Sequence, residues 1–501
     1  MRGGANVTTA GFIEAHGLWS DEQKAAAGEA LAAVKEKGLR CIRVSVADPQ
    51  GKLRSKTLMP GPFHAALKNG IEFTNAQYGF DSAEGIAYNP FMDGGGFGMA
   101  EMAGFANVIL VPDPTTFRVL PWSPGTGWVL GDLYFRDGRP VPFDARHKLK
   151  AALAELTREK YTFITGLEIE FYVTKVLDPK LAPEDMGTLG VPPTPPQVEA
   201  AARGFSYQVE DNLDRMDDFI CTLADHCVAL NLPLRTMENE MGPGQLEFTF
   251  DVQTGLKTAD TMSLFRSMVK QVATRMGLHA TFMTRPGLPN YVASGWHLHQ
   301  SLATADGRNA FASEPGSGEL LSDVGRHFVG GLLEHAAAAS VFTTPTVNGY
   351  RRRKPNSLAP DRATWGYDNR AAMIRVQGMP GEPSAHIENR IGEPGANPYL
   401  YIASQALAGL DGLRRKLDPG PLETSPYTAT HRPLLPTNLM EALEALKTST
   451  YFRSQLSDVF VDWLLGMKQS EVNRFLAAEP NWQATPDDVT AWEHREYFTR
   501  Y

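Results

Sequence analysis

Two glutamates separated by one residue, Glu168 and Glu170, lie in a segment whose alternating pattern predicts a β-strand over residues 162–173. A strand turns every second side chain toward the same face, so both carboxylates are expected on one face of a sheet. Alternating glutamates often form only the solvated face of an antiparallel sheet. Other segments of the chain favour a different interpretation, a site that gathers carboxylates around cations.

The carboxylate pattern recurs later in the chain. Glu240 and Glu247 flank the sequence Gly-Pro-Gly at 242–244, which is typical of a tight turn, so these two carboxylates can converge across a bend. The same period-two alternation recurs in two further segments, whose polar residues are His297, His299, Glu388 and Arg390. Five carboxylates and an imidazole match what two divalent cations require.

Composition narrows the class of protein. The 501 residues are 43% hydrophobic and 21% charged, which predicts a globular protein with a large core and two or more domains. A net charge of −9 argues against a nucleic-acid-binding protein. No apolar run has membrane-spanning length, and the first residues lack the apolar core of a signal peptide. The three cysteines, Cys41, Cys221 and Cys227, have no metal-ligand spacing. They are expected to be reduced thiols in a cytoplasmic protein.

Helix and strand patterns divide the chain into a small and a large part. An Ala-rich segment at 21–36 predicts a helix, and residues 41–46 alternate as a strand that turns at 48–51. These segments begin a small α+β unit over residues 21–115, preceded by a flexible terminus, residues 1–20. The larger domain covers 116–501, where polar-faced strands alternate with Ala- and Leu-rich helices. A Pro-rich stretch at 183–196 is expected to be an irregular surface insertion.

Eight segments, found in one order along the chain, resemble the glutamine synthetase family of ATP-dependent ligases. They are residues 48–52, 120–122, 166–171, 240–247, 295–302, 348–360, 369–375 and 387–400. The resemblance implies an α+β fold: an N-terminal β-grasp domain, then a catalytic domain whose antiparallel sheet forms an incomplete barrel surrounded by helices. It also implies a homo-oligomer of stacked rings, such as a dodecamer, with active sites shared between subunits.

The resemblance assigns the carboxylates to two divalent cations, Mg²⁺ or Mn²⁺. Glu170, Glu240 and Glu247 match the ligands of the first cation, and Glu168, His297 and Glu388 match those of the second. Oxygen-dominated ligand sets suit these hard cations better than zinc. Phosphoryl transfer from ATP to a carboxylate brings two anions together, and divalent cations with arginines cancel their repulsion.

The substrate residues follow from the same resemblance. Arg352 and Arg390 match arginines that hold glutamate, and Gly244 lies in a turn near it. Arg370 and Arg375 match arginines that contact the nucleotide phosphates and the phosphoryl group in transfer, while His299 and Ser301 match the ATP side. A planar guanidinium suits both carboxylate and phosphate. Asp48 matches an aspartate that a neighbouring subunit contributes to the ammonium site. By this resemblance, the expected catalytic residues are Arg370, Asp48 and Arg352.

Departures from the family pattern point to the nucleophile. Leu358 stands where ammonia-using members carry a glutamate on a mobile flap, and a leucine can neither attract ammonium nor accept its proton. Trp296 and Trp365 lie in neighbouring motifs and are expected to add aromatic surface. His386 replaces a nucleotide-side arginine, and the segment 292–296 differs from the pattern that holds the glutamate amino group.

The sequence therefore predicts an enzyme that joins L-glutamate to an organic amine, aromatic or small and alkyl, through γ-glutamyl phosphate. ATP, glutamate and the amine are its expected partners. One alternative is an ammonia-using glutamine synthetase in which Asp48 serves ammonium alone, and Leu358 argues against it. A catalytically inactive structural relative is another alternative, and the complete set of metal-ligand residues argues against that.

Overall fold

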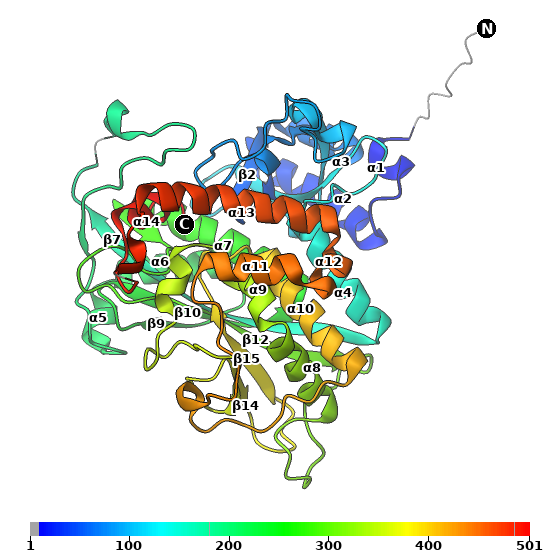
Figure 1. Ribbon diagram of the computed structural model, residues 1–501. Helices are drawn as coiled ribbons and strands as arrows, with labels where there is room; N and C mark the ends of the chain where they lie inside the picture. The colour runs from blue at the N-terminus through cyan, green and yellow to red at the C-terminus, as the bar shows by residue number, and fades with distance from the viewer. Residues whose placement is uncertain (1–9, 180, 485) are drawn as a thin grey trace. The chain divides into compact units, whose positions relative to one another are not determined.

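The computed structural model describes residues 10–179, 181–484 and 486–501, and the chain divides into two compact units, shown as a ribbon in Figure 1. The N-terminal unit comprises Met1–Gly79 and Asn89–His147, and the C-terminal unit comprises Phe80–Tyr88 and Lys148–Tyr501. None of the helices in the described residues combines the length and the apolar character that crossing a membrane requires.

The N-terminal unit is built on a mixed sheet with the strand order β2-β1-β6-β4-β3, and β5 pairs with β6. Its strands are β1 (Cys41–Ala47), β2 (Leu53–Leu58), β3 (Ile71–Thr74), β4 (Asn107–Pro112), β5 (Arg118–Val119) and β6 (Thr126–Tyr134). Its helices are α1 (Phe12–Ala15), α2 (Asp21–Glu36) and α3 (Pro60–Asn69), with short 3-10 turns at Ala76–Gly79, Ala100–Phe105 and Pro114–Thr116. β1 and β6 run parallel as central neighbours, an arrangement that agrees with the expected small N-terminal α+β domain.

The boundaries of this unit differ from the sequence-based expectation. The unit continues to His147 rather than ending near residue 115, because β6 is a central strand that pairs with both β1 and β4. Residues 10–20, which were expected to belong to a flexible terminus, are part of the folded unit. Ile13 is buried against Ile109, Val111 and Tyr134, so residues 10–20 pack on the unit, while residues 1–9 lie outside the described range.

The C-terminal unit contains the large sheet, with the strand order β13-β14-β15-β12-β7-β10-β9; β8 and β11 also pair with β7. The strands are β7 (Tyr161–Val176), β8 (Val198–Ala200), β9 (Leu234–Asn239), β10 (Gln245–Thr254), β11 (Leu278–Thr281), β12 (Trp296–Thr304), β13 (Trp365–Tyr367), β14 (Ile374–Gln377) and β15 (His386–Gly392). The pairings are antiparallel except for β13 with β14. This is the half-barrel sheet expected for the catalytic part of the chain.

Helices cover one side of the large sheet, as Figure 1 shows for α7, α9 and α10. The helices that follow β6 are α4 (Ala145–Arg158), α5 (Glu210–Asp214), α6 (Asp217–Ala229), α7 (Gly255–Arg275), α8 (Asp323–Glu334), α9 (Ala336–Thr343), α10 (Pro398–Arg415), α11 (Leu439–Thr448), α12 (Thr450–Leu456), α13 (Asp458–Ala478) and α14 (Ala491–Tyr497). Short 3-10 turns occur at Pro183–Asp185, Asn348–Arg352, Pro426–Thr428 and Trp482–Ala484. The turn Asn348–Arg352 is called η5 below.

Strand β7 separates the core from the functional face. Leu167, Ile169 and Phe171 are fully buried, and the Phe171 ring packs against Phe248 and Phe265, the latter on helix α7. The residues between them, Glu168 and Glu170, therefore point away from the helical layer. Burial of the apolar face fixes the register of β7, and the register in turn fixes the positions of its two carboxylates.

Candidate active site

Strand register brings the predicted carboxylates and histidines together on one face of the large sheet. His297 on β12 is paired with Glu168, and Glu247 on β10 is paired with Glu170. Glu388 on β15 lies opposite His299. Because neighbouring strands are about 4.8 Å apart, residues in register on one face place their side chains within reach of a shared ion.

The imidazole and carboxylate groups form a tight cluster. His297 Nδ1 lies 2.5 Å from Glu168 Oε1 and 3.4 Å from Glu388 Oε1, and His297 Nε2 lies 3.9 Å from Glu170 Oε1. The other oxygen of Glu168 lies 3.0 Å from His299 Nε2. Glu168 therefore stands between the two histidines and contributes to both sides of the cluster.

The turn between β9 and β10 positions Glu240 and also supports Glu170. Gly244 has φ +74°, and a Cβ there would lie 2.4 Å from the carbonyl oxygen of Val173, so the tight turn requires glycine. The backbone N–H of Glu240 donates to the carbonyl of Gln245, which closes the bend. Gln245 also donates to Glu170 Oε2 at 2.9 Å and so holds that carboxylate in place.

These residues fit divalent cations. Two groups of side chains present ligand atoms within 4.8 Å of one another: Glu168 with His299 and Glu388, and Glu168 with His297 and Glu247. Their donors are mainly carboxylate oxygens, which suit Mg²⁺ or Mn²⁺. The sequence-based grouping differs in detail, since His299 joins Glu388 here and Glu168 belongs to both groups.

The electrostatics of the cluster point to the same kind of ligand. Burial, reinforced by the neighbouring glutamates, raises the pKa of Glu247 to about 11, that of Glu170 to about 8 and that of Glu240 to about 7. Burial also opposes ionisation of Glu168, but His297 and His299 outweigh it and hold its pKa well below the usual range. Buried carboxylates that repel one another gain most from a cation.

This repulsion has a measurable effect on stability. A glutamate whose pKa is raised in the folded state binds more protons there, so stability falls as pH rises from the unfolded-state pKa to the folded-state pKa. We therefore expect the melting temperature without divalent cations to fall between pH 6.5 and 8, because Glu170 and Glu247, and in part Glu240, still hold protons in the folded state that the unfolded chain has already released. Saturating Mg²⁺ is expected to remove most of this fall, because the ionised carboxylates then bind the cation. Thermal unfolding in EDTA and in Mg²⁺ measures the difference, and identical pH profiles would contradict the cation assignment.

The arginines identified in the sequence surround this cluster. Arg352 Nη2 lies 3.0 Å from His297 Nε2, and its Nη1 donates to the carbonyl of Arg390 at 2.7 Å. Arg375 Nη1 forms an ion pair with Glu388 at 3.1 Å, and Arg390 also pairs with Glu388. Arg370 has an exposed side chain, and its carbonyl accepts a hydrogen bond from Arg390 Nε.

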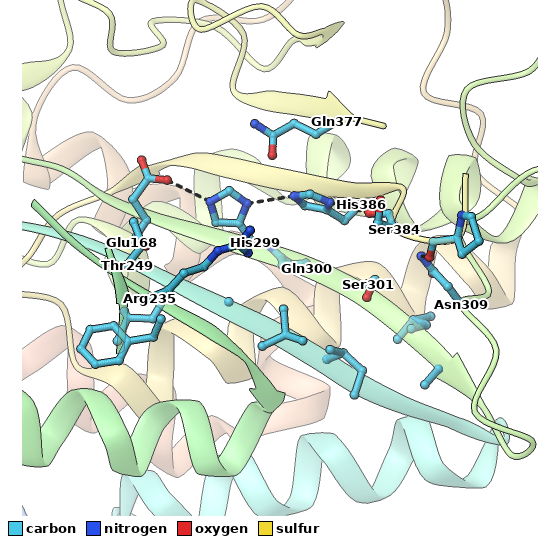
Figure 2. Close-up of a pocket in the computed structure, with 18 of the residues that line it drawn as sticks. Glu168, Arg235, Thr249, His299, Gln300, Ser301, Asn309, Gln377, Ser384 and His386 are labelled. Atoms are coloured by element: carbon cyan, nitrogen blue, oxygen red, sulfur yellow. Dashed lines mark hydrogen bonds and ion pairs between the residues drawn. The ribbon is translucent and has the colours of Figure 1, made fainter. Parts of the chain in front are cut away.

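A cavity of about 630 Å³ adjoins Glu168 and His299 (Figure 2). His299 Nδ1 lies 3.1 Å from His386 Nε2, so Glu168, His299 and His386 form a continuous chain of contacts along one wall. Ser301 lines the same cavity further from the cluster. The two positions expected on the nucleotide side, His299 and Ser301, therefore open onto one cavity.

The expectation that Trp296 and Trp365 add aromatic surface to the site is wrong. Trp296 and Trp365 are buried in the core, where Trp296 packs against Tyr401, so neither ring is available to a substrate. Two exposed rings that the sequence analysis missed lie on the segment before α5, at Phe205 and Tyr207. The backbone N–H groups of Phe205 and Gln208 donate to the carbonyls of Met241 and Asn239, so this segment runs beside Glu240. Burial and the charges of Glu240 and Glu247 raise the pKa of Tyr207. The Pro-rich stretch just before this segment predicted only an irregular surface insertion and did not indicate that aromatic side chains follow it.

Leu358 is 59% exposed and has φ +60°, a backbone conformation that leucine rarely adopts. Its carbonyl lies 3.4 Å from Arg390 Nη2, and the neighbouring Ser357 hydroxyl donates to the carbonyl of Arg352 at 3.1 Å. Tyr427 donates to the carbonyl of Ala359 at 3.0 Å. These contacts hold the segment that carries Leu358 beside the two arginines of the cluster.

Asp48 lies in the N-terminal unit, in the turn between β1 and β2. Its Oδ1 accepts from the backbone N–H groups of Gln50 and Lys52, and its Oδ2 lies 3.0 Å from Arg54 Nε. The carboxylate is 1% exposed within the chain, so it organises its own turn.

Comparison with known proteins agrees with this geometry. Residues 142–486 match the family model for the glutamine synthetase catalytic domain. A γ-glutamylanilide synthase from Acinetobacter sp. is 49% identical over 97% of this chain and 98% of its own length. A glutamine synthetase from Pyrococcus furiosus is 34% identical over 81% of this chain and 90% of its own length. A solved structure described as a GmaS/ADP complex aligns with a TM-score of 0.74 and 29% identity over 93% of this chain and 98% of its own. The chain belongs to the glutamine synthetase family of ligases.

Proposed function

We propose that this enzyme uses ATP to join the γ-carboxylate of L-glutamate to an organic amine that is aromatic or carries a small apolar group. The products are a γ-glutamyl amide, ADP and phosphate, formed through γ-glutamyl phosphate. The observation that carries the proposal is the carboxylate–imidazole cluster together with two arginines that contact it, Arg352 from η5 and Arg390 from β15. The similarity to a protein named γ-glutamylanilide synthase supports an amine other than ammonia.

Divalent cations would be held by Glu168, Glu170, Glu240, Glu247, His297 and Glu388, with Mg²⁺ or Mn²⁺ in at least two positions. When bound, they neutralise the phosphates of ATP and favour transfer of the terminal phosphoryl group. His299 and Ser301 are proposed to contact the nucleotide from the cavity of about 630 Å³.

The arginines supply the fixed positive charge. Arg352 and Arg390 are proposed to bind glutamate, because a guanidinium binds a carboxylate through two parallel hydrogen bonds. Gly244 keeps the adjoining turn narrow. Arg370 and Arg375 are proposed to contact the phosphates and the phosphoryl group in transfer. Arg370 is exposed, so it is free to turn toward a bound nucleotide.

Leu358 is the residue that favours an organic amine over ammonia as the nucleophile. An arylamine is neutral at pH 7 and can attack an acyl phosphate without first losing a proton, whereas ammonium needs a base. The segment of Leu358 lies against Arg352 and Arg390 and presents a hydrocarbon side chain instead of a base. The exposed rings of Phe205 and Tyr207 are proposed to add apolar surface for the amine.

The reaction is tested by measuring ADP release with ATP, Mg²⁺, glutamate and a panel of amines. We expect release that requires glutamate, the metal and an amine together. Glutamate labelled with ¹⁸O in the γ-carboxylate should transfer one ¹⁸O to the released phosphate, because that oxygen bridges the acyl phosphate. ADP release without transfer of ¹⁸O would rule out γ-glutamyl phosphate.

A shared active site is a separate proposal. If Asp48 of one subunit serves the cluster of its neighbour in a ring-shaped homo-oligomer, Asp48→Ala and Arg370→Ala chains carry complementary defects. We expect each variant alone to be nearly inactive, and mixed oligomers to recover up to about a quarter of the parental activity, because some interfaces combine two intact halves. Activity is measured after subunit exchange is confirmed by mass spectrometry. No recovery after complete exchange would mean that Asp48 acts only within its own turn.

A further inference from the structure

Glu393, a buried carboxylate to which the proposed reaction gives no role, follows directly after strand β15. Its side chain is 1% exposed, and three hydrogen-bond donors converge on it. Its Oε1 accepts the backbone N–H of Thr346 at 2.8 Å, and its Oε2 accepts the hydroxyls of Thr284 at 2.7 Å and Thr346 at 2.8 Å. A buried carboxylate that meets three donors is held in one position and holds its donors in turn.

A glycine lets the turn η5 approach this carboxylate closely. A Cβ at Gly349 would lie 2.2 Å from Glu393 Oε2, which is too short for any side-chain atom. The backbone N–H of Gly349 donates to the Thr346 hydroxyl at 3.0 Å. Because the same hydroxyl donates to Glu393, it joins the start of η5 to the carboxylate.

Arg352 makes the reverse connection, from the end of η5 back to β15. Its Nη1 donates to the carbonyl of Arg390 at 2.7 Å and to the carbonyl of Gly392 at 3.3 Å. Glu393 therefore holds the start of η5 to the end of β15, and Arg352 holds the end of η5 to the same strand. Without the first connection, the Arg352 guanidinium carries more of the contact between η5 and β15, so its donors are less free to bind a substrate.

Another buried acid fixes η5 to a different element. Glu493 of α14 pairs with Arg351 at 2.9 Å and accepts a hydrogen bond from Asn348 at 3.1 Å. This contact attaches the turn to the C-terminal helix, whereas Glu393 attaches it to the strand that carries Arg390. The two acids therefore constrain η5 from two elements.

The charge of Glu393 strengthens its hold on the turn. Burial raises the pKa of Glu393 to about 7, while its hydrogen bonds with Thr284 and Thr346 and the charge of Lys468 limit the rise. The carboxyl group is therefore mostly ionised at pH 8, and an ionised carboxylate offers only acceptors to the three donors. Hydrogen bonds to a charged acceptor are about twice as strong as neutral ones.

We infer that Glu393 is a positioning residue that acts through Thr346 and η5 to keep the Arg352 guanidinium in place for the carboxylate of the substrate. The substrate part rests on the proposed function, in which Arg352 binds glutamate, whereas the hold on η5 does not depend on it. Because Glu393 acts through Arg352, its loss is expected to weaken the binding of glutamate and to leave the KM for ATP nearly unchanged.

Two variants of nearly unchanged shape test the inference in the full-length protein. Glu393→Gln removes the charge and places an N–H group against the donors, and Thr346→Val removes the hydroxyl that joins η5 to the carboxylate. In steady-state kinetics at pH 8, we expect each to raise the KM for glutamate at least fivefold and to change kcat and the KM for ATP less than threefold. In hydrogen exchange of the ligand-free protein, measured by mass spectrometry, we expect at least tenfold faster exchange in residues 346–353.

The controls separate this role from general stability. Thr346→Ser retains the hydroxyl and is expected to restore the parental KM for glutamate and the parental exchange. Asp411→Asn is the matched control, because Asp411 is a buried acid on α10 whose partners are His335 at 2.7 Å and Arg415 at 2.8 Å. We expect it to lower the melting temperature and to change neither the KM for glutamate nor the exchange of residues 346–353.

A parental KM for glutamate in both Glu393→Gln and Thr346→Val would overturn the inference, and so would parental exchange of residues 346–353 in both. Equal changes in the KM for glutamate and the KM for ATP would also overturn it, because Glu393 would then support only the fold. If one variant does not fold, the other decides. A protein without glutamate-dependent ligation would refute the proposed function, and the exchange of residues 346–353 would still decide whether Glu393 holds η5.

Discussion

Replacing Glu247 with glutamine is expected to lower kcat for ligation by about 10³-fold or more, since it removes one charge that the cluster directs at a cation. The same change is expected to leave the metal-free protein at least as stable as the parent. Burial and the neighbouring glutamates raise the pKa of Glu247 to about 11, so this carboxyl group is protonated near pH 7 without a cation. Glutamine has nearly the same shape as the protonated acid, so it creates neither a cavity nor a new charge.

Steady-state kinetics at saturating Mg²⁺ and thermal unfolding in EDTA check the two halves of this prediction. Glu170→Ala is expected to abolish ligation as well. Glu199→Ala is the matched control, because Glu199 is an exposed carboxylate on β8 of the same sheet, 4.0 Å from Lys175. Full activity of Glu247→Gln at saturating Mg²⁺ would remove Glu247 from the metal site.

Leu358→Glu is expected to shift the ratio of kcat/KM for ammonium to kcat/KM for aniline at least tenfold toward ammonium. A carboxylate at this position can attract ammonium and accept its proton, a contribution of about 10²- to 10⁴-fold when a base is well placed. It also removes apolar surface. Burying about 80 Å² of an aromatic ring at about 25 cal/mol per Å² contributes about 2 kcal/mol, or a factor of about 30 in kcat/KM.

Leu358→Gln separates the two causes. Glutamine has the size and polarity of glutamate but is not a base, so it is expected to lower activity with aniline without raising activity with ammonium. The contacts of this segment with Arg352, Arg390 and Tyr427 involve its backbone and Ser357, so neither change at Leu358 removes them. An unchanged ratio in an active Leu358→Glu enzyme would show that Leu358 does not contact the amine.

The cluster could be predicted from sequence because period-two alternation in a strand directly determines which side chains share a face. Glu168 and Glu170 needed only this rule, and the Gly-Pro-Gly turn was enough to bring Glu240 and Glu247 into the same region. What the alternation does not give is the pairing of distant strands. That His299 contacts Glu168 depends on the register between β7 and β12, which only the folded sheet defines.

The local sequence pattern could not predict that the two tryptophans are buried or that Phe205 and Tyr207 are exposed. Both outcomes depend on contacts between residues that are distant in sequence. Trp296 lies in the same strand, β12, as the site residue His297. Neighbouring residues in a strand point to opposite faces, so Trp296 faces the helical layer while His297 faces the cluster. Tyr207 lies on an irregular segment whose backbone pairs with Asn239 and Met241, and no periodicity there indicates which way a side chain points. The later boundary of the N-terminal unit has the same origin, since the partners of β6 are distant in sequence.

The most direct test of the proposed function is a competition between aniline and ammonium at equal concentrations, with ATP, Mg²⁺ and glutamate saturating. The two products, γ-glutamylanilide and glutamine, are quantified by mass spectrometry, and their ratio gives the ratio of the two kcat/KM values. We predict that γ-glutamylanilide exceeds glutamine by about tenfold or more. Glutamine as the main product, formed at rates typical of a working ligase, would contradict the account and identify an ammonia-using enzyme.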